Sequence, residues 1–278
     1  MSDEAFFVPR GDVYVPTELT RGPWDADSQH AGPPAALIAR EIERLDGAVD
    51  RQVGRITFEL LRSVPIAPLR VEARLARTGR SVELVEASLF DDEGEVVRAS
   101  AWRLRSASIE IPAGLGSTDG PGLIGTSPST LRPGFAPPGP AEARPGRFPP
   151  TGQEVGYHTA MEYLFLRGDF DQPGPAMVWM RMRHPLVGGE APSPLQRVLV
   201  AADSGNGVSA TLDWRRYLFI NVDLTVHLHR APEGEWICLD AITVPEPNGI
   251  GLADTALYDQ RGPIGRAMQT LLVDERAR

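Results

Sequence analysis

Ser88-Leu-Phe-Asp-Asp-Glu-Gly-Glu-Val-Val-Arg-Ala99 joins two apolar segments through an acidic turn, and it recurs 168 residues later as Ala256-Leu-Tyr-Asp-Gln-Arg-Gly-Pro-Ile-Gly-Arg-Ala267. The same offset places residues 57–62 on residues 225–230 without a gap. A shared turn with matching flanks at one fixed offset is evidence of internal duplication. The period is far too long for a solenoid, so we expect two copies of one domain.

The first copy combines one helix with a series of strands. Apolar residues at helical spacing predict a helix at 34–45, and short apolar runs predict strands at 6–8 and 13–15. Further strands are predicted at 53–61, 69–77, 81–90 and 96–104, with Gly79 and the turn that ends at Gly94 as hairpin signals. One helix followed by four strands predicts an antiparallel sheet whose apolar face packs on that helix.

A proline-rich segment separates the two copies. Ten of the 26 prolines fall within residues 106–150, where large apolar residues are few, so this segment reads as an extended linker. We therefore expect an N-terminal domain at 1–108, a linker at 109–150 and a C-terminal domain at 151–278. In the second copy the pattern predicts a helical region at 194–212 and strands at 162–166, 177–182, 219–228, 235–244, 251–259 and 264–273.

Composition limits the classes of function. A net charge of −9 argues against a general nucleic-acid partner, which would need a basic face. The only cysteine, Cys238, cannot form an intrachain disulfide, and no apolar stretch is long enough to span a bilayer. The acidic start Met1-Ser-Asp-Glu-Ala has no leader pattern. We expect a cytoplasmic protein without a membrane partner, a metal or a cofactor.

Asp203 is the main candidate for chemistry. It follows the apolar run Val198-Leu-Val-Ala-Ala, and a buried carboxylate is costly unless it is paired or used. A structural alternative is that Asp203 caps a helix. The repeat favours function, because at the offset of 168 three polar residues replace apolar ones. These residues are Asp203, Asn221 and Gln269, which align with Ala35, Val53 and Ala101.

Several segments together resemble the type II, TesB-like acyl-CoA thioesterases. They are Gln29-His-Ala-Gly-Pro-Pro-Ala-Ala, residues 58–65, Ala201-Ala-Asp203, Asn221-Val-Asp-Leu-Thr-Val-His-Leu-His-Arg230 and Ala267-Met-Gln269. The resemblance implies an α+β double hotdog fold, in which each repeat wraps an antiparallel sheet around a long central helix. It also implies hydrolysis of fatty acyl-CoA by groups in the second repeat, and a homo-oligomer is expected because hotdog pairs expose broad sheet faces.

In that family an Asp, a Thr and a Gln hold the attacking water. The resemblance assigns these positions to Asp203, Asn221 and Gln269, with Asn221 departing from the family's hydroxyl. Asn can still donate and accept hydrogen bonds. Asp203 would be the base, the two amides would position the water, and backbone N–H groups near the helix start would face the oxyanion. Cys238 is interpreted as a buried structural thiol rather than a nucleophile.

Two other functions are open at this point. Asp25 and His30 have a spacing similar to that of the Asp and His in R-specific enoyl-CoA hydratases, although the residues between them differ from that family's. The protein could also bind acyl groups without catalysis. Arg62 and Arg230 occupy equivalent repeat positions, which favours a structural role, whereas Arg230 with Arg215 and Arg216 could instead offset CoA phosphates. We also expect the two repeats to pack side by side with a continuous sheet.

Overall fold

The computed structural model describes residues 4–45, 50–110 and 135–276. Buried and outward-facing residues alternate along the strands of the first half. In β5, for example, Val85, Ala87 and Leu89 are buried and the residues between them face outward. The elements of this half are β1 (Phe7–Arg10), β2 (Val13–Pro16), α1 (Gly32–Arg44), β3 (Arg51–Leu60), β4 (Arg70–Arg77), β5 (Val82–Phe90) and β6 (Glu95–Arg105).

The second half repeats this arrangement with additional short elements. In chain order, the helices and strands of this half are β7 (Arg144–Pro145), α2 (Tyr157–Ala160), β8 (Met161–Asp169), β9 (Gln172–Met182), α3 (Pro194–Ala202), α4 (Gly205–Val208), β10 (Tyr217–Asn221), β11 (Asp223–Leu228), β12 (Ile237–Pro245), β13 (Ile250–Asp259) and β14 (Gly262–Glu275). The strand expected at 219–228 is divided at Val222 into β10 and β11. β7, which pairs with β8, comes from the segment expected to be linker.

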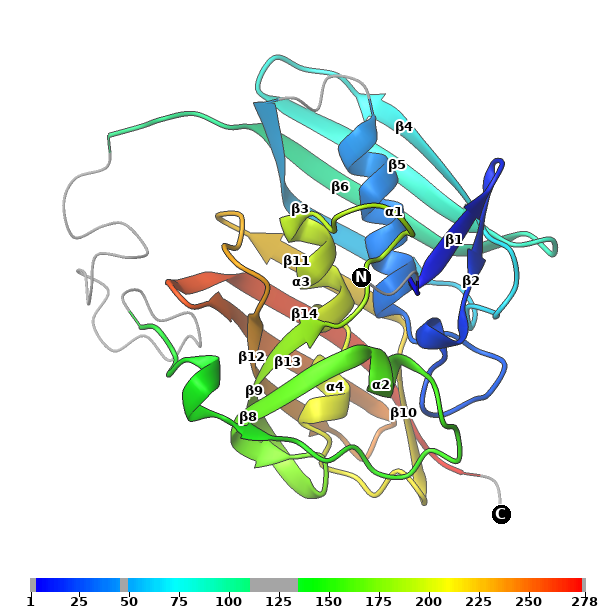
Figure 1. Cartoon of the computed structure of the whole chain (residues 1–278), viewed down its shortest axis with the longest axis vertical. Helices are drawn as coiled ribbons and strands as arrows, with labels where there is room; N and C mark the ends of the chain where they lie inside the picture. Colours follow the sequence, from blue (N-terminus) through cyan, green and yellow to red (C-terminus); the bar gives the residue numbers. More distant parts are fainter. Residues whose placement is uncertain (1–3, 46–49, 111–134, 277–278) are drawn as a thin grey trace.

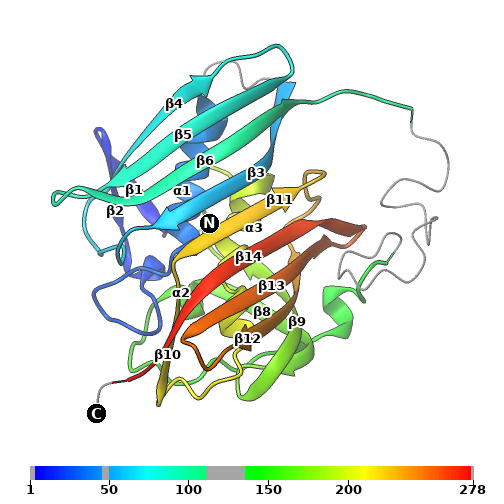
Figure 2. The same ribbon diagram turned by 180° about the vertical axis from the view of Figure 1, so that it is seen from behind.

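One antiparallel sheet of 12 strands runs through both halves. Its order is β4-β5-β6-β3-β11-β14-β13-β12-β9-β8-β7, with β10 paired to β14. Figure 1 shows α1 and α3 in front of this sheet, and Figure 2 shows the opposite face with the strands of the two halves side by side. The four strands predicted after the first helix form a meander only in part: β4, β5 and β6 are consecutive neighbours, but β3 pairs with β6 and not with β4.

The two halves meet at β3 and β11, which confirms the expected continuous sheet. Thr57 lies opposite Thr225, its counterpart 168 residues away, and the Thr225 hydroxyl donates to that of Thr57 at 3.1 Å. On either side, Asp223 pairs with Glu59 and His227 with Arg55, so the register is unchanged when the repeats are exchanged. The two copies are therefore related by an approximate two-fold axis that passes between Thr57 and Thr225.

The helices α1 and α3 pack against each other in opposite directions on one face of the sheet. At the start of α3, Ser193 caps the helix by accepting from the Gln196 backbone N–H, and its hydroxyl donates to Glu43 near the end of α1. At the other end, a Cβ on Gly32 would lie 2.5 Å from the carbonyl oxygen of Val200. Glycine at this position is what allows the close approach.

The helix expected at 194–212 is wrong in its length. α3 ends at Ala202, and after the turn at Asp203 and Ser204 only the four residues of α4 are helical. The helix is interrupted at Asp203 and Ser204, and the glycines of Gly205-Asn-Gly207, which have low helix propensity, lie in the short turn of α4 that follows.

The predicted alignment of Asp203 with Ala35 is also wrong. α1 begins at residue 32 and α3 at residue 194, so the helices are 162 residues apart, and Ala35 lies in the first turn of α1. The strands keep the offset of 168, because the second copy has six more residues between helix and strand. Register confirms the other two alignments: the pairs Val53↔Arg103 and Asn221↔Leu271 are equivalent, as are Val85↔Ala101 and Ala253↔Gln269.

The main core lies between the helices and the inner face of the sheet. Leu37, Ile38 and Ile42 of α1 and Val198 and Leu199 of α3 are fully buried there. Within the described ranges, no helix is long and apolar enough to cross a membrane. Residues 111–134, the central part of the expected linker, lie outside the described residues.

Candidate active site

A cavity of about 580 Å³ lies where the two halves meet, beside the start of α1 and the end of α3. Its walls come from the segments 22–31 and 60–64 of the first half and 148–170 and 203–222 of the second, together with Arg276. The rings of Trp24, Trp214 and Phe219 pack together at one side, with Trp24 5.8 and 6.2 Å from the other two. Most of the wall is apolar, so the few polar side chains in it stand out.

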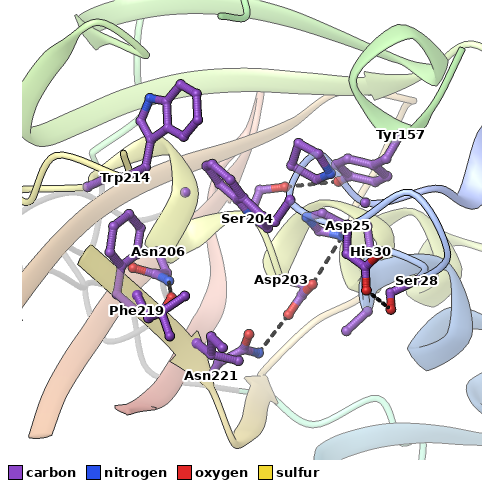
Figure 3. Close-up of a pocket in the computed structure, with 18 of the residues that line it drawn as sticks. Asp25, Ser28, His30, Tyr157, Asp203, Ser204, Asn206, Trp214, Phe219 and Asn221 are labelled. Carbon is purple, nitrogen blue, oxygen red and sulfur yellow. Dashed lines mark hydrogen bonds and ion pairs between the residues drawn. The ribbon is translucent and has the colours of Figure 1, made fainter. Parts of the chain in front are cut away.

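Asp203 lies in this wall and is 7% exposed. Its Oδ1 accepts from Nδ2 of Asn221 at 2.9 Å and from Nε2 of Gln269 at 3.1 Å. Its Oδ2 lies 3.1 Å from Nδ1 of His30. Figure 3 shows Asp203 between Asn221 on one side and His30 on the other. The structure thus brings together all three residues that the sequence proposed, and adds a histidine from the other half.

Gln269 is fixed by the turn at the end of α3. Its Oε1 accepts from the backbone N–H of Asn206 at 3.0 Å, and its Nε2 also donates to the backbone oxygen of Asp203 at 3.1 Å. A Cβ on Gly205 would lie 2.4 Å from Oγ1 of Thr255, so glycine lets α4 approach β13 and β14. The amide of Gln269 therefore connects the sheet to the Asp203 turn.

Asn221 is the last residue of β10, at the break before β11. Besides the bond to Asp203, its Nδ2 donates to the backbone oxygen of Asp223 at 3.3 Å. Both contacts use the amide nitrogen, which leaves its oxygen without a hydrogen-bond partner among the described residues. The helix-capping alternative for Asp203 is not what the structure shows, since its carboxylate accepts from two side-chain amides and faces a histidine.

His30 reaches the site from the loop before α1. Its ring stacks on Tyr157, with centroids 3.7 Å apart and planes 7° from parallel, and the Tyr157 hydroxyl donates to the Val200 oxygen at 2.6 Å. Burial lowers the pKa of His30 below its ordinary value, and the Asp203 charge opposes this effect only in part. The imidazole is therefore neutral near pH 7.

The pair proposed for a hydratase is not formed. The Asp25 carboxylate accepts from the Asp27 backbone N–H at 3.0 Å and from the Ser28 hydroxyl at 2.7 Å, both within its own turn. These two bonds lower the pKa of Asp25. His30 pairs instead with Asp203, across the boundary between the halves, a partnership that no local spacing in the sequence could indicate.

Tyr157 and Ser204 are site residues that sequence reasoning missed. The Ser204 hydroxyl lies 2.9 Å from the Tyr157 hydroxyl, and both residues are buried in the cavity wall. Burial is the main cause that raises the pKa of Tyr157 well above its ordinary value, so this phenol stays protonated. The only available signal was the position of Ser204 directly after Asp203; nothing in the sequence around Tyr157 indicated it.

Of the other residues considered from the sequence, Arg62 lines the cavity, whereas Arg230 and Cys238 do not. Arg230 forms a bidentate ion pair with Asp259, and Arg62 forms the equivalent pair with Asp91, which supports the structural interpretation of both arginines. Cys238 is fully buried, and burial raises the pKa of its thiol. The expected oxyanion contacts at a helix start stay a prediction.

Models of known protein families match both halves of the chain. A family model described as the acyl-CoA thioesterase N-terminal domain matches residues 20–104, and one described as the acyl-CoA thioesterase C-terminal domain matches residues 140–273. A search of curated proteins found no match.

Solved structures share the fold over nearly the whole chain. A protein of unknown function with a hot dog fold from Alicyclobacillus acidocaldarius is 16% identical with a TM-score of 0.68, covering 98% of this chain and 96% of its own. The acyl-CoA thioesterase II of Mycobacterium marinum is 15% identical with a TM-score of 0.61 and coverage of 96% and 94%. The proposed thioesterase II of Thermobifida fusca YX is 18% identical with a TM-score of 0.70 and coverage of 96% and 95%.

Proposed function

Since this chain belongs to the acyl-CoA thioesterase family, we propose that it hydrolyses fatty acyl-CoA esters with a water molecule that Asp203 activates. Membership in the family makes the protein a thioester hydrolase with the hotdog fold and implies an acyl-CoA substrate. The proposal adds the fatty acyl group and the role of Asp203. The products are a free fatty acid and CoA.

The observation that carries this proposal is the position of Asp203. A buried carboxylate that accepts from Asn221 and Gln269 lies in the wall of an apolar cavity, at the junction of the halves. Hydrolysis requires removal of a proton from water as its oxygen attacks the carbonyl carbon, and a carboxylate placed beside the acyl cavity supplies the negative charge for this step. The aromatic and aliphatic walls suit an acyl group rather than a charged one.

The test is the variant Asp203→Asn, assayed for release of free thiol from a series of saturated acyl-CoA esters. Asn keeps the shape of the side chain and loses the carboxylate, so we expect a fall in turnover of about 10²- to 10⁴-fold. The melting temperature should stay close to that of the unmodified protein. Hydrolysis at the unmodified rate would contradict the proposed role of Asp203.

The proposal extends to the architecture. We propose that the two halves are two hotdog domains, that is, a double hotdog, and that the protein acts in the cytoplasm as a homo-oligomer. The two-fold relation at Thr57 and Thr225 and the antiparallel contact of α1 with α3 support the first part. The same proposal places the end of the first domain at residue 108 and the end of the linker at residue 150.

A further inference from the structure

We propose that His30 is the group that takes the proton from the attacking water, and that Asp203 acts through it by holding and charge-stabilising the imidazole. This inference rests on the proposed function and names a further catalytic residue for the same reaction. It places a catalytic residue in the first half of the chain, whereas the sequence predicted catalytic residues only in the second half.

The first step is that both oxygens of Asp203 already have partners. Oδ1 accepts from the amides of Asn221 and Gln269, and Oδ2 faces Nδ1 of His30 at 3.1 Å. The Asp203 side chain is only 5% exposed. The carboxylate therefore presents little surface to a water in the cavity, and the two amides serve to hold Asp203 in place.

The second step is the orientation of His30. Its Nδ1 lies 3.1 Å from Oδ2 of Asp203, whereas its Nε2 has no hydrogen-bond partner in the described part of the chain and is not among the polar atoms sealed from solvent. His30 lines the cavity, and Nε2 is its ring nitrogen that is left free to contact a molecule bound there. The parallel ring of Tyr157, held by the Val200 oxygen and Ser204, prevents the imidazole from turning away.

The third step is the position of the proton on the ring. The Gly32 backbone N–H donates to Nδ1 at 3.2 Å, and Oδ2 of Asp203 lies 3.1 Å from the same nitrogen, so a donor and an acceptor compete for Nδ1. The carboxylate decides between them, because an unprotonated Nδ1 would place a lone pair against a negative oxygen. With the proton on Nδ1, Nε2 carries the free lone pair, and a neutral imidazole is the form that can accept a proton.

The reaction then balances as follows. Nε2 of His30 takes one proton from water while the water oxygen forms a bond to the thioester carbonyl carbon. The resulting imidazolium is stabilised by the Asp203 carboxylate at Nδ1. When the tetrahedral intermediate collapses, the C–S bond breaks and the Nε2 proton passes to the departing sulfur. The fatty acid and CoA thiol are formed, and His30 is neutral again.

This assignment also explains Asn221. A hydroxyl at this position could bind a water, but the Asn221 amide nitrogen donates to Asp203 and to the Asp223 backbone oxygen instead. Asn221 therefore acts as a positioning residue that fixes the carboxylate. The departure from the family's threonine fits a site in which the water is held at the imidazole.

The decisive variant is His30→Asn, because an Asn amide nitrogen can replace Nδ1 as a donor to Asp203 but cannot accept a proton. If His30 is the base, His30→Asn and His30→Ala should both lower kcat by about 10²- to 10⁴-fold with KM little changed. Added imidazole should restore turnover to His30→Ala, increasingly as the pH rises and imidazole loses its proton.

The matched control is His184→Ala. His184 is 17% exposed, against 14% for His30, and it also faces a carboxylate, Glu4, at 4.0 Å, but it does not line the cavity. We expect this variant to keep its turnover and to show no response to imidazole. Wild-type turnover should fall on the acid side as His30 becomes protonated; the other titratable groups in contact with its ring are Asp203 and Tyr157.

The outcomes separate this inference from the proposed function. Full activity of His30→Asn with an inactive Asp203→Asn would overturn the role of His30 and leave the proposed function standing. Inactivity of His30→Ala without imidazole rescue, together with a lowered melting temperature, would also overturn it, since His30 would then be structural. If the unmodified protein releases no thiol from any acyl-CoA, the proposed function itself fails.

Discussion

The Asp203 carboxylate tolerates burial because three nitrogen atoms surround it. Two belong to the uncharged amides of Asn221 and Gln269, which donate hydrogen bonds to Oδ1, and the third is Nδ1 of His30, 3.1 Å from Oδ2; within the described residues the charge is not paired with a permanent cation. A permanent ion pair would neutralise the carboxylate, whereas neutral donors leave its charge available to an imidazolium that forms during the reaction.

At the residue scale, the two amides should behave as one unit. Asn221→Ala and Gln269→Ala each remove one donor to the same oxygen, and each should reduce turnover less than Asp203→Asn does. Because both act only through Asp203, the double variant should lose less activity than the two single losses predict together. Steady-state turnover of the single and double variants measures this coupling.

Ala101 provides the control for this experiment. It is the counterpart of Gln269 in the first half and is fully buried. Ala101→Gly should lower the unfolding free energy and leave turnover unchanged. Strictly additive losses for the two amides, or a loss of turnover in Ala101→Gly, would contradict the prediction.

At the element scale, the repeated turn is stabilised by an ion pair. Asp259 lies in the turn between β13 and β14 with its side chain fully buried, and it accepts two bonds from Arg230 and others from the backbone N–H groups of Glu233 and Arg261. Gly262 closes the turn at a φ of 129°, and Gly94 closes the equivalent turn at 132°. These angles explain why both copies have glycine there.

Arg230→Ala should therefore lower stability without affecting substrate binding. Loss of charged hydrogen bonds to a buried carboxylate costs roughly 1–3 kcal/mol of unfolding free energy. Burial raises the pKa of Asp259, but the bonds from Arg230 and the backbone outweigh it and lower the pKa overall. The pair thus stabilises the protein above the unfolded-state pKa of about 3.9, and this contribution is lost as the pH falls through the folded-state value.

Denaturant unfolding at several pH values tests this. The difference between Arg230→Ala and the unmodified protein should be full near pH 7 and decrease in acid, with KM for acyl-CoA unchanged throughout. A raised KM at unchanged stability would instead assign Arg230 to the CoA phosphates.

At the scale of the whole molecule, the outer face of the sheet differs between the halves. The second half exposes apolar residues from adjacent strands, each at least 38% exposed; they are Ile242, Val244, Ile250, Leu252 and Leu272. At the equivalent positions the first half has Arg74, which pairs with Glu86, and the apolar residues Ala76, Val82, Leu84 and Leu104; of the three larger ones only Leu104, at 42%, is similarly exposed. The second half thus exposes more large apolar side chains on this face than the first, which favours it for a two-fold contact between copies of the chain.

The proposed homo-oligomer is thus expected to form through the second half. Leu252→Glu should shift the molar mass in light scattering at micromolar concentration toward that of a single chain, because a charge would be buried in the contact. Leu84→Glu, at the equivalent position of the first half, should leave the mass unchanged. A monomeric unmodified protein, or equal effects of both variants, would contradict this prediction.

The sequence by itself determined the repeat, the strands and two of the three alignments. The offset of 168 predicted that the two sheets continue into one, because equivalent copies bury equivalent faces, but it did not indicate that β3 and β11 are the strands that meet. It also singled out Asp203, Asn221 and Gln269, since polar residues in an apolar pattern need partners. The family models and related structures confirm the family and the hotdog fold that the same segments suggested.

The partner of His30, the break after α3 and the alignment of the helices were decided only by the tertiary structure. His30 and Asp203 are 173 residues apart, and their contact depends on the close approach of α1 to α3 at Gly32. Periodicity records which face of an element is buried, but it carries no information about which loop ends meet across the boundary between two halves. That contact follows from packing of the whole sheet and both helices, so it appears only when the chain is folded.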